Sequence, residues 1–572
     1  MKSPLLARAA RHLPAGLAEL TRPGALGQLV KDEVGRIVVA ERVLREKGMA
    51  KALRPRGALA LARLALERQT NPAALFRFWA ANSPDAVAMA WSTGSWTFAE
   101  LEDRIARLAT GLARRGVGKA STAVIVVKNR PDFLVLHTAL GRLGAASVSA
   151  SWRSTPAELA YLAEHSGASM LFFDHEIVDT VRRTPLPRIP RERQVTIAGR
   201  LPGFALLDDW LAARPGRVRA SRDEGTVVMY TSGTTGKPKG AVRRFRRETL
   251  GAALGFIGET PMAPGDVHLV ACPMYHATAF GFLALSYALG GSVVLLETFE
   301  PRAFLEAIER HRVTTTAVVP TMLHRTLALG PSELARHDTS SLRAIFSGGS
   351  ALSASVATRT LDAFGDVLFN FYGATETGLV TLASPADLRA APGTIGRALP
   401  GNEIRLLDPE GRDVPAGEVG ELYVRNAMLI EGYHHDEAAT RGSMQGQFFS
   451  VGDLARRDAL GRYHLEGRKR DLIISGGVNV YPAEVEAAIE AHPDVAEAAV
   501  VGVADAEWGE RVVAFVAPRA GATLDPADLA AWCRERLAGP KTPRTWRVVD
   551  ALPRNPTGKV LKRDLRDAAA GA

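Results

Sequence analysis

The chain has 572 residues, of which 47% are hydrophobic and 23% charged, and a formal net charge of +10. This balance is typical of a soluble globular protein, and the length implies more than one domain because hydrophobic cores stop growing at about 250–300 residues. Its two cysteines, Cys272 and Cys533, are too few for a disulfide framework or a zinc site, so the sequence favours a reducing, cytoplasmic location.

Most of the positive charge lies in residues 1–70, which hold 14 Lys and Arg against 6 Asp and Glu and so carry +8 of the +10. Apolar residues recur at helical spacing between residues 26 and 44, and residues 58–66 are apolar and helix-prone. We therefore expect a basic helical extension over 1–70. Either it packs on the main body with its charges in solvent, the favoured interpretation, or it makes peripheral contact with the inner face of an anionic membrane. No signal peptide is expected.

The remaining 502 residues are close to neutral, with 57 basic and 55 acidic side chains. Because nucleic-acid enzymes generally carry a basic face on their main body, we expect no nucleic-acid partner. Residues 277–296 carry no formal charge and are long enough to span a bilayer. Gly290 and Gly291 interrupt them, however, and indicate a helix, a tight turn and a buried strand instead.

Short apolar runs alternate with helix-like stretches along the main body. Strands are expected at 122–127, 145–150 and 170–173, helices at 131–143 and 155–165, and the alternation returns near 301–349. This order predicts an α/β fold of parallel-type sheets covered by helices.

Three changes of pattern predict the domain boundaries. The large domain is expected over 71–469, and its short strands between Gly and Pro turns at about 392–466 indicate a β-rich subdomain. Residues 470–572 are expected to form a small α+β domain, in which Pro482 suits the first turn of a helix.

A loop rich in glycine, hydroxyl groups and lysine follows the strand-like residues 225–229. Its sequence, YTSGTTGKPKG over 230–240, combines backbone N–H groups, hydroxyl donors and positive charge, the components of a phosphate cradle. Only two residues separate Gly233 from Gly236, so this is not a Walker A loop. The candidate phosphate-binding residues are Thr231, Ser232, Gly233, Thr234, Thr235, Gly236, Lys237 and Lys239.

Two further motifs carry nucleotide chemistry. NFYGATETG at 370–378 offers an aromatic face for a purine, a hydroxyl for a phosphate and a carboxylate for Mg²⁺. VGDL at 451–454 offers Asp453, whose carboxylate can accept hydrogen bonds from both hydroxyls of a ribose.

These motifs, together with PRNPTGKVLK at 553–562, occur in the order found in the adenylate-forming superfamily. The chain resembles the acyl-CoA synthetases of that superfamily across about residues 225–563. The resemblance implies that a carboxylate attacks the α-phosphate of ATP with Mg²⁺ present, giving acyl-AMP and pyrophosphate. The thiol of CoA then displaces AMP, after the small domain has rotated.

The resemblance also implies roles for single residues. Tyr372 is expected to stack on adenine, Thr375 to touch the phosphate and Glu376 to bind Mg²⁺. Lys559 is expected to hold the α-phosphate during adenylation, and His276 of CPMYHATAF to gate or orient the acid. The other expected nucleotide contacts are Gly349, Asn370, Gly373, Asp453 and Arg468.

Other implied positions concern the second step. Ser475, Gly476 and Gly477 are expected to border the tunnel for the pantetheine arm of CoA, because a backbone without side chains suits a narrow channel. Arg470 stands at the hinge, where the family usually has Asp or Lys. Val451 stands where the family often has Thr.

The acyl pocket is expected to be small-sided and apolar, lined by Ala277, Ala279, Gly281 and Gly348. No Asp or Glu occurs between Asp266 and Glu297 to pair with an ammonium group, which disfavours an amino-acid substrate. The favoured acid is a medium- to long-chain fatty acid, and aryl or sterol-like acids stay open.

Two other functions stay open as well. A fatty acyl-AMP ligase would load a carrier protein instead of CoA. A membrane- or nucleic-acid-binding protein with an inactive catalytic body is the non-enzymatic alternative. The presence of Glu376, Asp453, Arg468 and Lys559 argues against the second.

Overall fold

A computed structural model describes most of the chain. The described residues are 43, 45–67, 71–212, 214, 216, 218, 221, 225–231, 239–243, 247–434, 436–555 and 558–570. Residues 232–238 of the glycine-rich loop lie outside this set, as do the apolar residues of the extension between 26 and 38.

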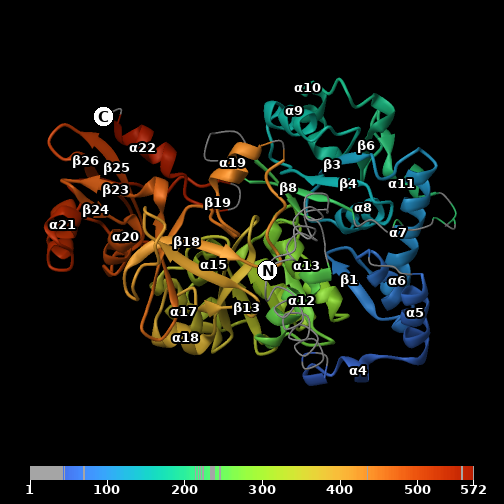
Figure 1. Ribbon diagram of the computed structural model, residues 1–572. Coiled ribbons are helices and arrows are strands. Elements are labelled where there is room, and N and C mark those ends of the chain that lie inside the picture. The colour runs from blue at the N-terminus through green and yellow to red at the C-terminus, as the bar shows by residue number, and fades with distance from the viewer. Residues whose placement is uncertain are drawn as a thin grey trace, which may run out of the picture.

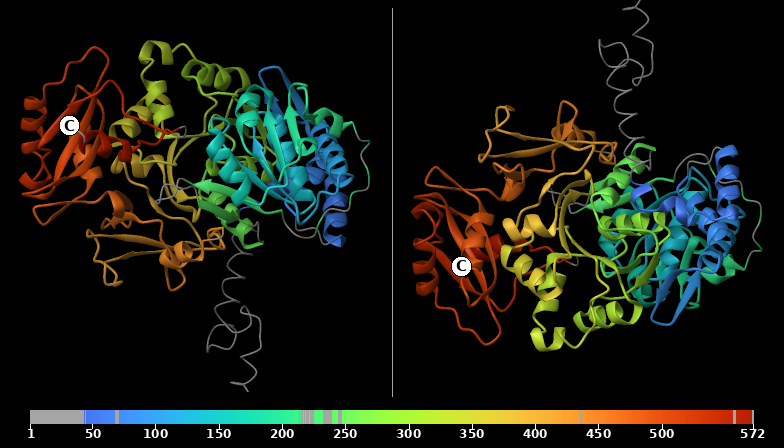
Figure 2. Two further views of the ribbon diagram at one scale, coloured as in Figure 1. Left: turned by 90° about the horizontal axis from the view of Figure 1, so that it is seen from above. Right: turned by 90° about the horizontal axis from the view of Figure 1, so that it is seen from below.

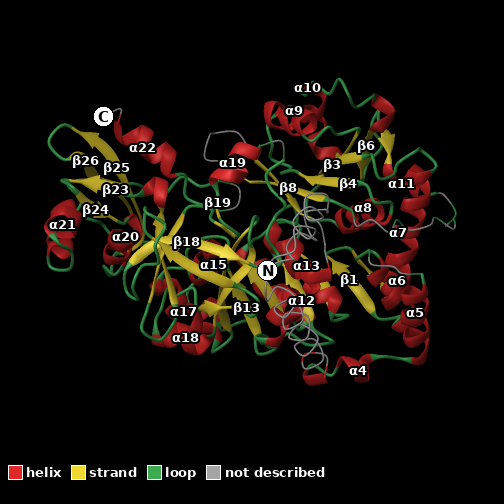
Figure 3. Cartoon of the chain, in the orientation of Figure 1, coloured by secondary structure: helices red, strands yellow, loops and turns green. Residues whose placement is uncertain are grey.

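The large domain contains two sheets that are mainly parallel (Figures 1 and 3). The seven-stranded sheet has the order β7-β6-β5-β3-β4-β8-β9, and only β8 and β9 pair antiparallel. Its strands are β3 (Thr122–Val126), β4 (Ala146–Ser149), β5 (Met170–Asp174), β6 (Gln194–Ile197), β7 (Ala205–Leu206), β8 (Val227–Thr231) and β9 (Lys239–Arg243). The glycine-rich loop therefore joins two strands at the edge of this sheet.

The nine-stranded sheet has the order β16-β15-β14-β13-β12-β10-β11-β1-β2, and its six central strands are parallel. Its strands are β1 (Val87–Trp91), β2 (Gly94–Thr97), β10 (Val267–Val270), β11 (Ser292–Leu295), β12 (Thr315–Val318), β13 (Ala344–Ser347), β14 (Leu368–Ala374), β15 (Gly378–Ala383) and β16 (Arg397–Ala398).

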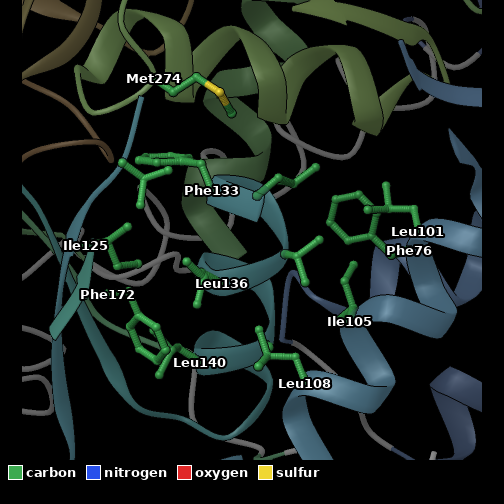
Figure 4. Packing of buried hydrophobic residues seen from close by; sticks show 14 of the residues in the cluster. Phe76, Leu101, Ile105, Leu108, Ile125, Phe133, Leu136, Leu140, Phe172 and Met274 are labelled. Carbon is green, nitrogen blue, oxygen red and sulfur yellow. The ribbon is translucent and has the colours of Figure 1, made fainter. Parts of the chain in front are cut away.

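The core between the two sheets is built around α8 (Pro131–Arg142), which is buried on nearly every side because its sequence is apolar nearly all round. Phe133, Leu136 and Leu140 of α8 pack towards Ile125 of β3 on one side and towards α7 (Phe98–Ala113) on the other (Figure 4). Helix α13 (Ala277–Ala288) closes the same core through Leu283 and Tyr287, and α6 (Ala74–Asn82) packs beside it.

The helix, turn and strand expected at 277–296 are α13, a turn with Gly290 at φ +70°, and β11. Within the described part of the chain, no helix combines the length and the apolar content needed to cross a membrane.

The β-rich subdomain is a sheet of order β19-β20-β18-β21-β22, with β17 paired to β18. Its strands are β17 (Glu403–Leu407), β18 (Val419–Arg425), β19 (Met444–Gln445), β20 (Phe448–Phe449), β21 (Asp453–Arg457) and β22 (Tyr463–Arg468). A 3-10 turn at Lys469–Asp471 then leads into the small domain.

The small domain has a sheet of order β24-β23-β26-β25, with β27 paired to β26. Its elements are β23 (Ile473–Ser475), β24 (Val478–Val480), α20 (Pro482–Glu490), β25 (Val495–Asp505), β26 (Gly509–Pro518), α21 (Pro526–Arg534), β27 (Thr545–Val548) and α22 (Lys562–Ala570). It lies at the opposite end of the molecule from the helices between residues 49 and 82, as Figure 2 shows. The α/β architecture with a small α+β domain confirms the fold class expected from the sequence.

The described part of the extension packs on the main body. Lys47 Nζ donates to the carbonyl of Thr260 at 2.5 Å, and helices α4 (Met49–Ala52) and α5 (Pro55–Leu66) follow. The backbone N–H of Arg54 donates to Asn82 Oδ1 at 2.8 Å, and Asn82 Nδ2 donates to Ala52 O at 3.1 Å. Gly57 allows this contact, because a Cβ there would lie 2.1 Å from Asn82 Oδ1.

This close approach predicts that Gly57→Leu loosens α5. Overpacking costs about 1–3 kcal/mol, so we expect amide hydrogen exchange within residues 55–66 to become about fivefold to 150-fold faster, with 1.4 kcal/mol per factor of ten. Hydrogen-exchange mass spectrometry measures this exchange rate. The control is Ala58→Leu, the next residue along, whose side chain is exposed. Equal exchange in the two variants would contradict the docking role of Gly57.

Candidate active site

A single cavity of about 3880 Å³ brings most of the candidate residues together. It lies where β12, β13 and β14 end and extends into the cleft between the large and small domains. Ligands bind at the carboxyl ends of parallel strands because the loops there converge on one edge of the sheet. The candidates on its wall are His276, Ala277, Gly281, Gly349, Asn370, Tyr372, Gly373, Thr375, Glu376, Asp453, Arg468, Arg470 and Lys559.

Asp453 joins two of the other candidates. Tyr372 Oη, from β14, donates a hydrogen bond of 2.7 Å to Asp453 Oδ2, and Arg468 Nε lies 3.1 Å from Asp453 Oδ1. The last pair follows from the register of β21 and β22, in which Asp453 stands opposite Arg468. Burial and the adjacent carboxylate raise the pKa of Tyr372 well above its usual value, so this tyrosine stays a hydrogen-bond donor. Each carboxylate oxygen keeps a second lone pair that can accept from a ribose hydroxyl.

Glu376 is buried and held by Tyr433, which the sequence analysis did not single out. Tyr433 Oη donates to Glu376 Oε1 at 3.1 Å. Residue Tyr433 also forms a β-bridge with Ala241 of β9, and the N–H of His434 donates to Gly240 O at 2.8 Å. The strand that leaves the glycine-rich loop is thereby tied to the carboxylate expected to meet the metal. A lone tyrosine in a loop gives no sequence signal of its own.

The described residues contain no group of three or more His, Cys, Asp and Glu side chains that could hold a metal alone. Glu376 nevertheless fits Mg²⁺, which proteins usually bind through one or two carboxylates together with the phosphates of a substrate. A single buried carboxylate beside the end of a phosphate-type loop is such a donor.

Lys559 reaches the cavity on a short loop of the small domain. The loop is closed by two bonds of 2.9 Å, from Lys559 N to Asn555 Oδ1 and from Asn555 N to Lys559 O. Gly558, at φ +83°, lets its tip approach the large domain, because a Cβ there would lie 2.4 Å from Thr321 Oγ1. Burial lowers the pKa of Lys559 to about 8, with Arg468 lowering it further and Asp453 opposing the shift.

His276 precedes α13 and borders the cavity. Its Nε2 is buried without a hydrogen-bond partner, and burial lowers the pKa of the ring to about 4. The imidazole is therefore neutral near pH 7. A neutral ring suits orientation of an acid, and the gating or orienting role of His276 stays a prediction.

The remaining nucleotide candidates shape the wall through the backbone. Asn370 Nδ2 donates to Thr394 O at 2.8 Å. Gly349 has φ +82°, and a Cβ at Gly373 would lie 2.0 Å from Gly378 O. Strands β14 and β15 can therefore approach closely only with glycine at 373.

Two candidates of the acyl pocket lie off the cavity wall. Ala279 is buried in the core between the sheets. A Cβ at Gly348 would lie 2.3 Å from the ring of Phe371, so this glycine serves packing between strands. Ala277 and Gly281 do border the cavity.

Ser475, Gly476 and Gly477 are also absent from the wall in this arrangement of the domains. They form the turn between β23 and β24, where the N–H of Gly476 donates to Trp508 O at 2.8 Å. Both glycines have positive φ, +57° and +76°. Arg470 lies in the 3-10 turn between the domains, and burial and Arg468 lower its pKa. Its neighbour Asp471 pairs with Arg566 of α22 at 2.5 Å.

The chain matches the AMP-binding enzyme family over residues 76–434 and the C-terminal domain of AMP-binding enzymes over residues 484–559. The chain belongs to the AMP-binding enzyme family. This confirms the resemblance to the adenylate-forming superfamily. Residues 1–75, which include α4 and α5, lie before the first match.

Three relatives indicate the range of the family around this chain. A feruloyl-CoA synthase from Amycolatopsis sp is 37% identical over 486 residues, 85% of this chain and 96% of the relative. A fatty acid–[acyl-carrier-protein] ligase, ScoC, from Streptomyces coeruleorubidus is 31% identical over 504 residues, 86% of this chain and 95% of the relative. The structure of o-succinylbenzoate CoA synthetase from Bacillus subtilis with its acyl-adenylate intermediate has a TM-score of 0.75 and 29% identity, and covers 86% of this chain and 98% of that one.

The position of Asp453 predicts that Asp453→Asn weakens ATP binding. The change leaves Arg468 facing a neutral amide, and a hydrogen bond to a charged group contributes about 1.5–3 kcal/mol. We expect the KM for ATP to rise about tenfold or more in a pyrophosphate-release assay. Tyr372→Phe is the matched variant, because it keeps the ring and the carboxylate and removes one donor. A larger effect of Tyr372→Phe than of Asp453→Asn would contradict the central role of the carboxylate.

The lowered pKa of Lys559 predicts a pH dependence. A lysine with a pKa of about 8 is charged below that pH and neutral above it. Adenylation, read as kcat/KM for pyrophosphate release, should therefore fall as the pH rises through about 8. In Lys559→Arg, whose guanidinium stays charged, whatever activity remains should not show this decline. The same decline in both enzymes would assign it to another group.

Proposed function

We propose that this protein is an AMP-forming acid–CoA ligase whose acid is aromatic or another bulky hydrophobic carboxylic acid. One observation carries the proposal. Asp453, Arg468, Glu376 and Lys559 face one cavity that continues along the apolar residues of α13. The 37% identical feruloyl-CoA synthase supports the aromatic acid and CoA as acceptor.

In the first step a carboxylate oxygen of the acid attacks the α-phosphorus of ATP. The bond from that phosphorus to pyrophosphate breaks, and acyl-AMP forms. Asp453 holds the ribose, the loop at 231–239 holds the phosphates, and Lys559 approaches the α-phosphate with a positive charge. Positioning and electrostatic stabilisation supply the catalysis, since little covalent chemistry falls to the protein.

Glu376, oriented by Tyr433, would hold Mg²⁺ against the phosphates, and the ion would supply charge neutralisation there. In the second step the thiol of CoA releases its proton to solvent, and the thiolate sulfur attacks the acyl carbon. The bond from that carbon to the phosphate oxygen breaks, and AMP leaves. Neutral His276, at the start of α13, orients the acyl group between the two steps.

A medium- to long-chain fatty acid, the acid favoured by the sequence, is the second candidate. The apolar residues of α13 on the cavity wall favour it, because they can line an aliphatic chain. The similarity to ScoC supports a carrier protein as the alternative acceptor. The four clustered residues disfavour an inactive binding protein.

The test is a panel of cinnamic-type, benzoic, indoleacetic and linear fatty acids with ATP, Mg²⁺ and either CoA or a phosphopantetheinylated carrier protein. We expect AMP and aryl-CoA to form, with linear acids slower. Lys559→Ala should lower pyrophosphate release by about 10²-fold or more, a loss typical of removing one group that stabilises developing charge.

Synthetic acyl-AMP supplied with CoA separates the two steps. Lys559→Ala should convert it to acyl-CoA at close to the rate of the unmodified protein. If acyl-AMP accumulates in the presence of CoA but is consumed in the presence of the carrier protein, the acceptor is the carrier protein and not CoA. Pyrophosphate release from none of the acids would refute the ligase proposal.

A further inference from the structure

One face of α13 consists of small residues and is left open. Ala277, Gly281, Ala284 and Ala288 recur at spacings of four, three and four residues, so they share one side of the helix. All four border the cavity. No atom lies within 4 Å of the position that a Cβ on Gly281 would occupy, so open space faces the middle of the helix.

The other sides of α13 are filled. Leu283 and Tyr287 belong to the core between the sheets, and Trp79 Nε1 donates to Tyr287 O at 2.7 Å. Phe282 packs against Phe346, with ring centroids 4.8 Å apart. The small-residue face is therefore a side of α13 on which a ligand could lie, and it extends about 16 Å along the helix axis at 1.5 Å per residue.

A polar group stands at one end of this groove. His276, with its buried and unpartnered Nε2, precedes Ala277 and borders the same cavity as Glu376 and Lys559. A buried ring nitrogen without a partner is unfavourable unless a ligand supplies one. An acyl oxygen placed there would leave the rest of the acid to extend along α13.

Part of the wall of the same cavity comes from the N-terminal extension. Leu53, at the end of α4, and Leu61 and Leu64 of α5 border the cavity. Among the described residues from 43 to 79, those that line it carry no charge. The contact of Gly57 with Asn82 holds α5 at this position. Leu53 and Leu61 are themselves 40% and 45% exposed, whereas Leu59 and Leu66 of α5 are 73% and 86% exposed and lie off the cavity.

We propose that α4 and α5 complete the acyl-binding groove and select acids whose apolar body reaches beyond a single ring. The proposal rests on the proposed function and names the part of the chain that sets substrate length. The substrates it favours are extended arylalkanoic, fused-ring or long-chain acids. Residues outside the family match would then determine specificity, while the matched domains supply the chemistry.

The experiment compares Leu64→Trp and Leu61→Trp with the matched control Leu59→Trp, using a series from phenylacetic to phenyldecanoic acid. A tryptophan at 64 or 61 takes up space in the cavity where the extension borders it, whereas one at 59 points to solvent. We expect kcat/KM for the longest acids to fall at least about tenfold in the first two variants, with 1.4 kcal/mol per factor of ten. Phenylacetic acid should be used unchanged, and Leu59→Trp should match the unmodified protein throughout.

Calorimetric binding of phenyldecanoic acid gives a second readout that does not depend on turnover. Weaker binding in Leu64→Trp and Leu61→Trp than in Leu59→Trp supports the proposal. Equal binding in all three, or an equal loss of activity on short and long acids, overturns it, since the acid would then lie elsewhere or the substitutions would act through folding. Absence of AMP formation from every acid with the unmodified protein refutes the ligase function alone, because the binding comparison still decides the role of α4 and α5.

Discussion

The carboxylate of Asp453 is the interaction on which the site depends. It accepts a hydrogen bond from Tyr372 of the large parallel sheet, pairs with Arg468 at the end of the β-rich subdomain, and faces Lys559 of the small domain. Three parts of the chain thus meet at one negative group. Without it, Arg468, Arg470 and Lys559 would concentrate positive charge in a partly buried space, which is unfavourable when nothing compensates it. The lowered pKa of Lys559 reflects burial first and this remaining repulsion second. A bound triphosphate supplies the missing negative charge, so nucleotide binding and entry of Lys559 stabilise each other.

A second connection links Glu376, the proposed metal ligand, to the strand that leaves the glycine-rich loop. Tyr433 donates to Glu376, and its own backbone bridges to β9, the strand that leaves the glycine-rich loop. The strand edge therefore positions the loop and the carboxylate together. One tyrosine thus connects the two groups that are proposed to meet the same phosphates.

Much of the fold and of the site could be predicted from the sequence, and the misses have physical causes. Alternating apolar runs predict parallel strands because buried strands are apolar on both faces, and motif order indicates Glu376, Asp453 and Lys559 individually. The pairing of Tyr372 with Asp453 depends on where two separate sheets meet, which no local pattern reports.

Two misses in the acyl pocket have local causes. Ala279 is two residues beyond Ala277 and so points to the opposite side of α13, whereas Gly281 lies on the same side as Ala277. At Gly348 the absence of a side chain admits the ring of Phe371, and glycine alone does not reveal whether it admits a neighbour or a ligand. Part of α5 faces the cavity because Gly57 contacts Asn82. These two residues are 25 positions apart, so the contact depends on tertiary packing.

The positions of Lys559 and the glycine pair at 476–477 constrain how two reactions share one cavity. Both belong to the small domain, whose strands form one sheet with cores on its two faces. Lys559 lies in the cavity, while the turn between β23 and β24 lies away from it and is fixed to β26 by the bond from Gly476 to Trp508. Because a packed sheet moves as a unit, the glycine pair can reach the cavity only when the whole domain turns. If the domain turns about the 3-10 segment that contains Arg470, as the resemblance implies, the movement withdraws Lys559. The resemblance implies that these glycines border the path of the thiol and that Lys559 assists adenylation. In that case Lys559 and the glycine turn cannot occupy the cavity at the same time. The order of the two steps then follows from the rigidity of one small sheet.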